Sequence, residues 1–132
     1  MTSPLLEVRD LATHFFTREG VVRAVDGVSF MLHAGEVLGL VGESGSGKTV
    51  TGYSLLGLVD PPGRIVHGSI RFEGQELVGM DPRELRRMRG RRLAMVFQDP
   101  TTTLNPVLTI AEQMRLAMNA HERLSATAMR AR

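Results

Sequence analysis

Residues 42–49 are Gly42-Glu43-Ser44-Gly45-Ser46-Gly47-Lys48-Thr49, and this stretch decides how the rest of the chain is interpreted. It fits the pattern G-x-x-x-x-G-K-[ST] of the phosphate-binding P-loop. A short apolar run from Glu36 to Val41 precedes it and is typical of a buried parallel strand. The residues from Val50 to Leu58 follow with the pattern of a helix. A strand, a glycine-rich loop and a helix in this order predict a phosphate site.

Each position in the loop has its own chemical reason. Glycines permit backbone angles and close approaches that a Cβ atom would block. Successive N–H groups then point inward and form an anion-binding nest at the positive end of the following helix. We expect Lys48 to reach the β- and γ-phosphates and the Thr49 hydroxyl to bind Mg²⁺. The predicted nucleotide-binding residues of this stretch are Gly42, Glu43, Ser44, Gly45, Ser46, Gly47, Lys48, Thr49 and Val50.

Lys48 is the only lysine among the 16 Lys and Arg residues of the chain. Elsewhere the chain carries its positive charge as arginine, whose planar fork does not replace a compact ammonium in a tight loop. The single lysine therefore stands where phosphate chemistry requires one. The structural alternative is a flexible Gly- and Ser-rich turn, and the flanking strand and helix patterns favour the phosphate loop.

Composition places the chain among ordinary globular proteins. It has 132 residues, which is at most one domain, with 42% hydrophobic and 23% charged residues and a formal net charge of +2. The absence of cysteine excludes a disulfide framework, a thiolate metal site and a cysteine nucleophile. No apolar run approaches the roughly 20 residues that span a bilayer, and the N-terminus becomes charged too early for a signal peptide. We expect a cytoplasmic protein that reaches a membrane only through a partner.

The first part of the chain, about 1–35, has the spacing of an antiparallel hairpin. One strand is expected from Leu5 toward Phe16, a turn over 17–20, and a second strand over 21–32 that is broken at Asp26-Gly27. The P-loop strand and helix occupy about 36–59 and end at Pro61-Pro62.

The remainder alternates strands and helices. The pattern predicts strands over 69–72 and 92–97 and a helix that begins at Asp81-Pro82 and runs to about Arg89. Thr109 is expected to cap a final helix running toward Arg132. The apolar face of that helix would carry Ile110, Met114, Ala117 and Met118.

The segment from Arg83 to Arg92 reads RELRRMRGRR and is strongly basic. We interpret it as a solvated helix face followed by a turn. An anionic lipid surface or an acidic partner is the alternative. Nucleic acid is not expected as a partner, because no aromatic residues that could stack on bases are interleaved.

Four stretches together resemble the ATP-binding subunit of an ABC transporter of the dipeptide, oligopeptide and nickel importer type. They are LLEVRDLATHFFTREGVVRAVDGVSF, GEVLGLVGESGSGKTV, RRMRGRRLAMVFQDP and TLNPVLTI. The resemblance runs from about Leu5 to the last expected helix. It implies an α/β fold, a P-loop NTPase core with an N-terminal antiparallel β subdomain, truncated before the signature loop. The Q-loop region would cover about 92–108, and the helical subdomain would begin over about 109–132.

The resemblance also assigns roles outside the loop. Phe15 matches the aromatic residue that stacks on adenine, although it could instead be a core aromatic beside Phe16. Ala24 matches the small residue packed beside that ring. Gln98 matches the Q-loop glutamine, a catalytic residue that touches Mg²⁺ and the attacking water. The implied partners are ATP with Mg²⁺, transmembrane permease subunits, a second ATP-binding subunit and, indirectly, an external solute-binding protein. The implied location is the cytoplasmic face of the membrane, as a peripheral subunit.

Several elements of the family pattern do not occur in this sequence. The LSGGQ signature loop, the apolar strand ending in Asp-Glu, the D-loop and the switch histidine would all lie after residue 132. The family is a transport ATPase that energises import of peptides or similar solutes. We expect this chain alone to bind nucleotide weakly and to hydrolyse essentially none. Two other functions remain open: a non-catalytic nucleotide-binding or interaction module, and a soluble ABC-type ATPase acting on nucleic acid or the ribosome.

Overall fold

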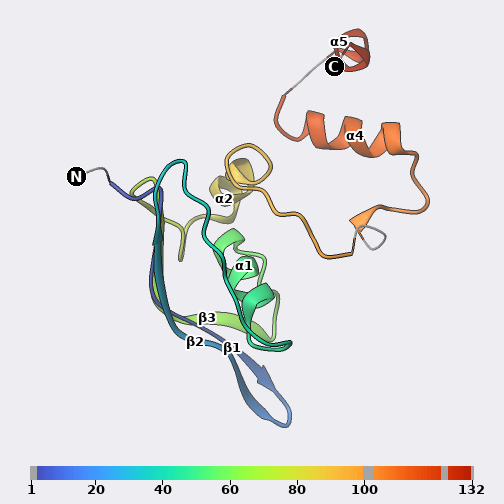
Figure 1. Ribbon diagram of the computed structural model, residues 1–132. Coiled ribbons are helices and arrows are strands. Elements are labelled where there is room, and N and C mark those ends of the chain that lie inside the picture. The colour runs from blue at the N-terminus through green and yellow to red at the C-terminus, as the bar shows by residue number, and fades with distance from the viewer. Residues whose placement is uncertain (1–2, 100–102, 123–124, 132) are drawn as a thin grey trace. The chain divides into compact units, whose positions relative to one another are not determined.

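The computed structural model describes residues 3–99, 103–122 and 125–131. The chain forms two compact units, Met1–Leu85 and Arg86–Arg132. The first unit contains the sheet and the phosphate loop, and the second contains the later helices (Figure 1).

The first unit is built on a four-stranded antiparallel sheet. Its strands are β1 (Leu6–Thr17), β2 (Gly20–Leu32), β3 (Gly63–Phe72) and β4 (Gln75–Glu76), in the order β2-β1-β3-β4. A tight turn joins β1 to β2, so the predicted N-terminal hairpin is confirmed. The strand predicted over 69–72 is the end of the longer β3.

The two long strands of the hairpin are irregular where their registers shift. Extra residues occur on β1 between Val8 and Leu11, where Asp10 has a φ of 46°, and on β2 around Asp26-Gly27. The predicted break of the second strand at Asp26-Gly27 is therefore wrong, because the strand continues through a bulge. Such bulges bend a strand and increase its twist, and Figure 1 shows the resulting curvature of the sheet.

Helix α1 (Lys48–Leu56) lies along the inner side of the curved sheet (Figure 1). Its buried residues are Thr51, Ser54 and Leu56. The helix ends at Gly57, which has a φ of 58° and closes the last turn as a left-handed cap. The helix expected over 50–58 is thus present but begins and ends two residues earlier. The buried apolar side chains of the sheet are Val8, Leu11, Ala12, Val25, Ile70 and Phe72.

The segment 36–41 is not a strand, which corrects the expected P-loop strand. It forms no β-ladder with any described strand, and Figure 1 draws it without an arrow. Val37 is 100% exposed and Val41 93% exposed. The physical reason is that a parallel strand requires hydrogen-bonded neighbours, and no described strand pairs with this segment.

The strand expected over 92–97 is also absent. Only a single parallel bridge between Arg89 and Leu93 forms there, and Val96 is 97% exposed. Helix α2 (Pro82–Met88) confirms the helix predicted after Asp81, whose carboxylate accepts a hydrogen bond from the Arg83 N–H at 2.7 Å.

The second unit contains α4 (Ile110–Asn119) and α5 (Ala126–Arg130). The predicted helix after Thr109 is confirmed at its start, but it ends at Asn119 and does not continue toward Arg132. Its apolar side chains Ile110 and Met114 are exposed rather than packed. Within the described part of the chain, no helix has the length and apolar character required to cross a membrane.

Candidate functional site

The phosphate loop is held in shape by its own backbone. Gly45 and Gly47 have φ values of 80° and 91°, which residues with a Cβ rarely adopt. The Ser46 N–H donates to the Glu43 carbonyl at 3.2 Å, and the Thr51 N–H donates to the Gly47 carbonyl at 2.8 Å. The loop therefore turns sharply and enters α1 at Lys48.

Gly47 is required for a second reason, the close approach of the loop to β2. A Cβ atom at Gly47 would lie 2.1 Å from the carbonyl oxygen of Ala24 and 3.6 Å from Cγ2 of Val25. The loop is thus packed directly on the backbone of β2. Ala24, which the sequence singled out, lies at this contact. Val25 was not singled out, because nothing in its sequence context separates it from other apolar strand residues.

The ammonium group of Lys48 lies inside the loop. It donates hydrogen bonds to the carbonyl oxygens of Gly42 at 2.6 Å and Glu43 at 2.7 Å, and to the Ser46 hydroxyl at 3.2 Å. These contacts hold the positive charge at the concave side of the loop. An ammonium placed there attracts an anion without a further rearrangement of the main chain.

A cavity of about 150 Å³ opens at the junction of the loop, α1 and β2. It is lined by Ala24, Gly45, Ser46, Gly47, Lys48, Thr49 and Val50. Backbone N–H groups at a helix start, an ammonium and hydroxyl groups suit a phosphate. The Thr49 hydroxyl is also the hard oxygen donor that Mg²⁺ prefers, so these residues fit a magnesium–phosphate group. Seven of the residues predicted from the sequence are thus brought together here.

Phe15 lies beside this region in the sheet. It pairs with Val22 of β2, and Ala24 stands two residues farther along the same strand. The ring is half-buried, so part of it remains accessible. Its predicted role in stacking on a base stays a prediction.

Gln98 belongs to the other unit, Arg86–Arg132, where it is an exposed residue of irregular chain. Its assignment to Mg²⁺ and the attacking water therefore stays a prediction. Among the described residues, no group of three or more His, Cys, Asp or Glu side chains is arranged to hold a metal ion.

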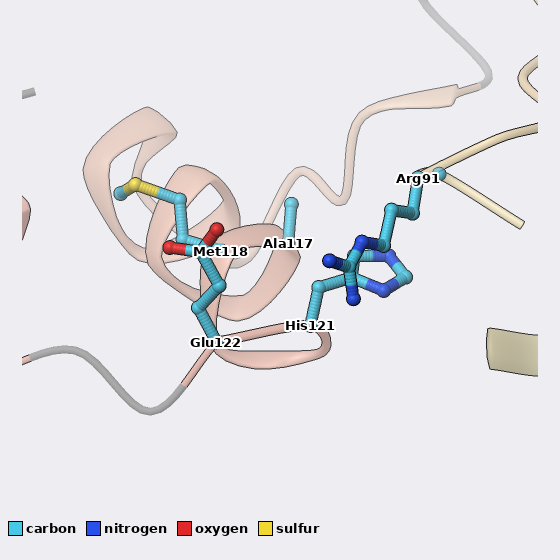
Figure 2. Close-up of a pocket in the computed structure, with 6 residues that line it drawn as sticks. Arg91, Ala117, Met118, His121 and Glu122 are labelled. Atoms are coloured by element: carbon cyan, nitrogen blue, oxygen red, sulfur yellow. The ribbon is translucent and has the colours of Figure 1, made fainter. Parts of the chain in front are cut away.

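A cavity of about 390 Å³, larger than the loop cavity, lies elsewhere, in the second unit (Figure 2). Its wall comes from the turn after α2 and the end of α4, and is formed by Gly90, Arg91, Ala117, Met118, His121 and Glu122. The titratable side chains of its wall are those of Arg91, His121 and Glu122, so a carboxylate stands among the basic groups. Size alone would select this cavity, but its chemistry does not favour a phosphate. The loop cavity remains the candidate site.

Known proteins with similar sequences are ATP-binding proteins, which agrees with a phosphate site at the loop. The sequence profile of the ABC transporter family matches residues 25–132. A probable peptide ABC transporter ATP-binding protein of Sinorhizobium fredii is 48% identical over 122 residues, which are 92% of this chain and 36% of the relative. The oligopeptide transport ATP-binding protein OppD of Bacillus subtilis is 45% identical over 129 residues, 97% of this chain and 36% of the relative.

A putative peptide import ATP-binding protein of Brucella abortus is 49% identical over 131 residues, 99% of this chain and 40% of that protein. The chain thus spans between 36% and 40% of the length of these three relatives.

Solved structures show the same fold. The dimeric structure of MJ0796, a bacterial ABC transporter cassette, aligns with a TM-score of 0.81 at 23% identity, over 96% of this chain and 53% of that one. A nucleotide-free ATP-binding cassette from an ABC transporter aligns with a TM-score of 0.63 at 20% identity, over 98% of this chain and 46% of that one. The expected α/β cassette fold with an N-terminal antiparallel sheet is confirmed.

Proposed function

This chain belongs to the ABC transporter family, and on that premise we propose that it supplies the ATP-binding loop of a transport ATPase that energises peptide import. The observation that carries the proposal is the Lys48 ammonium held within the glycine loop, at the start of α1. The names of the relatives supply the solute class, because three of them are described as peptide or oligopeptide transport proteins.

The loop would bind the β- and γ-phosphates of ATP. The backbone N–H groups of the loop would donate to the phosphate oxygens, and Lys48 would neutralise part of their charge. Preorganised backbone donors are more effective than solvent at stabilising charge during phosphoryl transfer. Lys48 would exchange its hydrogen bonds to the Gly42 and Glu43 carbonyls for bonds to phosphate oxygens. Mg²⁺, when bound, would neutralise phosphate charge, and Thr49 would hold it. Phe15 and Ala24 would contact the adenine ring.

Hydrolysis requires more than this site contains. A water must be positioned for in-line attack, and charge must be stabilised on both sides of the phosphate. None of the residues that line the described loop cavity is a carboxylate. We therefore propose that these residues bind nucleotide, and that turnover belongs to the longer protein. There Gln98 would contact Mg²⁺ and the attacking water, and a second ATP-binding subunit would complete the site.

The assembly follows from the same proposal. Transmembrane permease subunits would bind the region after Gln98, and the solute would be delivered to them by an external binding protein. The subunit would lie at the cytoplasmic face of the membrane as a peripheral component. No role for nucleic acid is proposed, because the basic segment lacks interleaved aromatic residues.

Calorimetric titration of the chain with ATP and Mg²⁺ tests the binding step. We expect saturable binding that Lys48→Ala reduces by at least tenfold, and that Lys48→Arg does not restore because a guanidinium fork does not fit the loop carbonyls. Arg18→Ala is the matched control, since it removes one exposed positive charge outside the loop. Equal ATP affinity of the wild type and Lys48→Ala would contradict the proposal.

A further inference from the structure

Gly63 is a buried glycine, and its backbone conformation is one that other residues also adopt. It is the first residue of β3 and stands opposite Phe15 of β1 in the antiparallel ladder. Unlike most glycines of this chain, it does not have a left-handed φ, so alanine could adopt its backbone conformation. The reason for glycine at this position must therefore be steric.

The Phe15 ring occupies the space that a side chain at position 63 would need. A Cβ atom there would lie 2.5 Å from Cε1 and 2.8 Å from Cδ1 of Phe15, and 2.8 Å from Cγ1 of Val59. Contacts below 3.0 Å require an atom to move. The ring therefore packs directly on the Gly63 backbone, with Val59 beside it.

The neighbouring phenylalanine is held differently. The Phe16 ring is stacked under the Arg64 guanidinium, whose carbon lies 4.3 Å from the ring centroid. Phe16 is exposed, whereas Phe15 is half-buried on Gly63. Each of the two adjacent rings thus has its own contact on β3. Of the two, only the Phe15 ring occupies space that is open because residue 63 is a glycine.

We infer that Gly63 is a positioning residue for the adenine base of the nucleotide, acting through the Phe15 ring that it seats. This inference rests on the proposed function, because Phe15 is the residue proposed to stack on adenine. A ring that is displaced outward by a methyl group at position 63 loses the orientation needed for stacking. The phosphate loop, which does not contact Gly63, keeps its own geometry.

The test compares two ligands, Mg-ATP and inorganic tripolyphosphate, which has the phosphates but no base. Because stacking of a base on an aromatic ring contributes to nucleotide affinity, we expect Gly63→Ala to weaken ATP binding by about fivefold to tenfold. Binding of tripolyphosphate is expected to stay unchanged. Gly39→Ala is the matched control, since Gly39 also has no left-handed φ and a Cβ there meets nothing within 4 Å.

A double-mutant cycle separates positioning from a general structural effect. In a Phe15→Ala background the ring is gone, so Gly63→Ala should cause no further loss of ATP affinity. An equal loss in both backgrounds, or no loss in either, overturns the inference. If Gly63→Ala does not fold, Val59→Ala replaces it. Removing the Val59 methyl groups loosens the same ring, and about a twofold loss specific to ATP is expected.

The contact between the Phe15 ring and Gly63 can be tested by NMR without any nucleotide, and therefore independently of the proposed function. The ring current of Phe15 should shift the Gly63 Hα resonances in the wild type, and Phe15→Leu should abolish that shift. Absence of the shift overturns the seating of the ring whatever the chain binds. A wild type that shows the shift but binds neither ATP nor tripolyphosphate overturns the proposed function, and the base-positioning role with it.

Discussion

The hydroxyl oxygens of Thr13 and Ser54 lie 2.8 Å apart in the buried seam between β1 and α1. Ser54 donates its own proton to the Val50 carbonyl at 2.8 Å, so Thr13 is the donor in the pair. This one polar contact joins the sheet to the helix that begins at the phosphate loop. It therefore contributes to holding α1 on β1.

Because Thr13 is the donor and Ser54 the acceptor, substitutions of the two residues should lower the unfolding free energy by different amounts. Ser54→Ala leaves the Thr13 hydroxyl buried without an acceptor and is expected to cost roughly 1–3 kcal/mol of unfolding free energy. Thr13→Val removes only a donor and should cost about 1 kcal/mol. Urea unfolding of both variants and of the double variant measures this. Costs that add fully in the double variant would contradict a direct interaction.

Two glycines of the loop should respond differently to alanine. Both have a left-handed φ, which costs roughly 1–2 kcal/mol for a residue with a Cβ. At Gly45 the added atom meets nothing within 4 Å, whereas at Gly47 it would lie 2.1 Å from the Ala24 carbonyl oxygen. Gly47→Ala should therefore lower the unfolding midpoint clearly more than Gly45→Ala. Equal midpoints would show that the loop does not pack on β2 as described.

Glu76 makes the stability of the first unit depend on pH. Partial burial raises its pKa, but hydrogen bonds from the Ser69 hydroxyl and the N–H groups of Ile70 and Val78 outweigh this, and the net pKa lies below its ordinary value of 4.5. A lowered folded-state pKa stabilises the fold above the unfolded-state value, and this stability is lost as pH falls through the folded-state pKa.

We therefore expect the wild type to lose stability as the pH falls below about 5. Glu76→Gln should be less stable near neutral pH and should lose less stability on acidification. Thermal unfolding between pH 7 and pH 3 measures both. Glu7→Gln provides the control, because it also removes a carboxylate from the sheet. A pH profile of Glu76→Gln parallel to that of the wild type would contradict the assignment.

The start of α4 carries a capping box. The Thr109 hydroxyl accepts a hydrogen bond from the Glu112 N–H, and the Glu112 carboxylate accepts one from the Thr109 N–H at 2.8 Å. Because α4 buries no side chain among those described, its helicity depends on such local contacts. Thr109→Ala should reduce helical Cα chemical shifts over 110–114, while Thr109→Ser retains the cap. Unchanged shifts in Thr109→Ala would contradict a stabilising role.

The unpaired apolar segment 36–41 is an aggregation hazard. Exposed extended chain with apolar side chains is a template for strand pairing between molecules. Val37→Lys should raise the fraction of monomer in analytical ultracentrifugation at a given concentration. Val107→Lys is the control, because Val107 is 84% exposed but lies outside this segment. Equal gains from both substitutions would point to net charge as the cause.

The elements that the sequence predicted correctly are those with local signals. The hairpin follows from alternating residues and a tight turn, and α2 and α4 follow from Asp81-Pro82 and Thr109, which occupy helix starts. The two strands expected over 36–41 and 92–97 were wrong for a shared reason. Their apolar runs match the composition of buried parallel strands, but a strand forms only when neighbours pair with it. None of the described residues supplies those neighbours.

The sequence by itself determined the phosphate loop, since the identity of eight consecutive residues specifies both the turn and the chemistry. It also determined the family, through stretches that span most of the chain. Only the tertiary structure decided that Gly47 packs on the Ala24 carbonyl, that Lys48 is held by the loop, and that Phe15 is seated on Gly63. These contacts join segments far apart in the chain, and no local pattern of residues encodes which atoms meet when the strands and the helix pack.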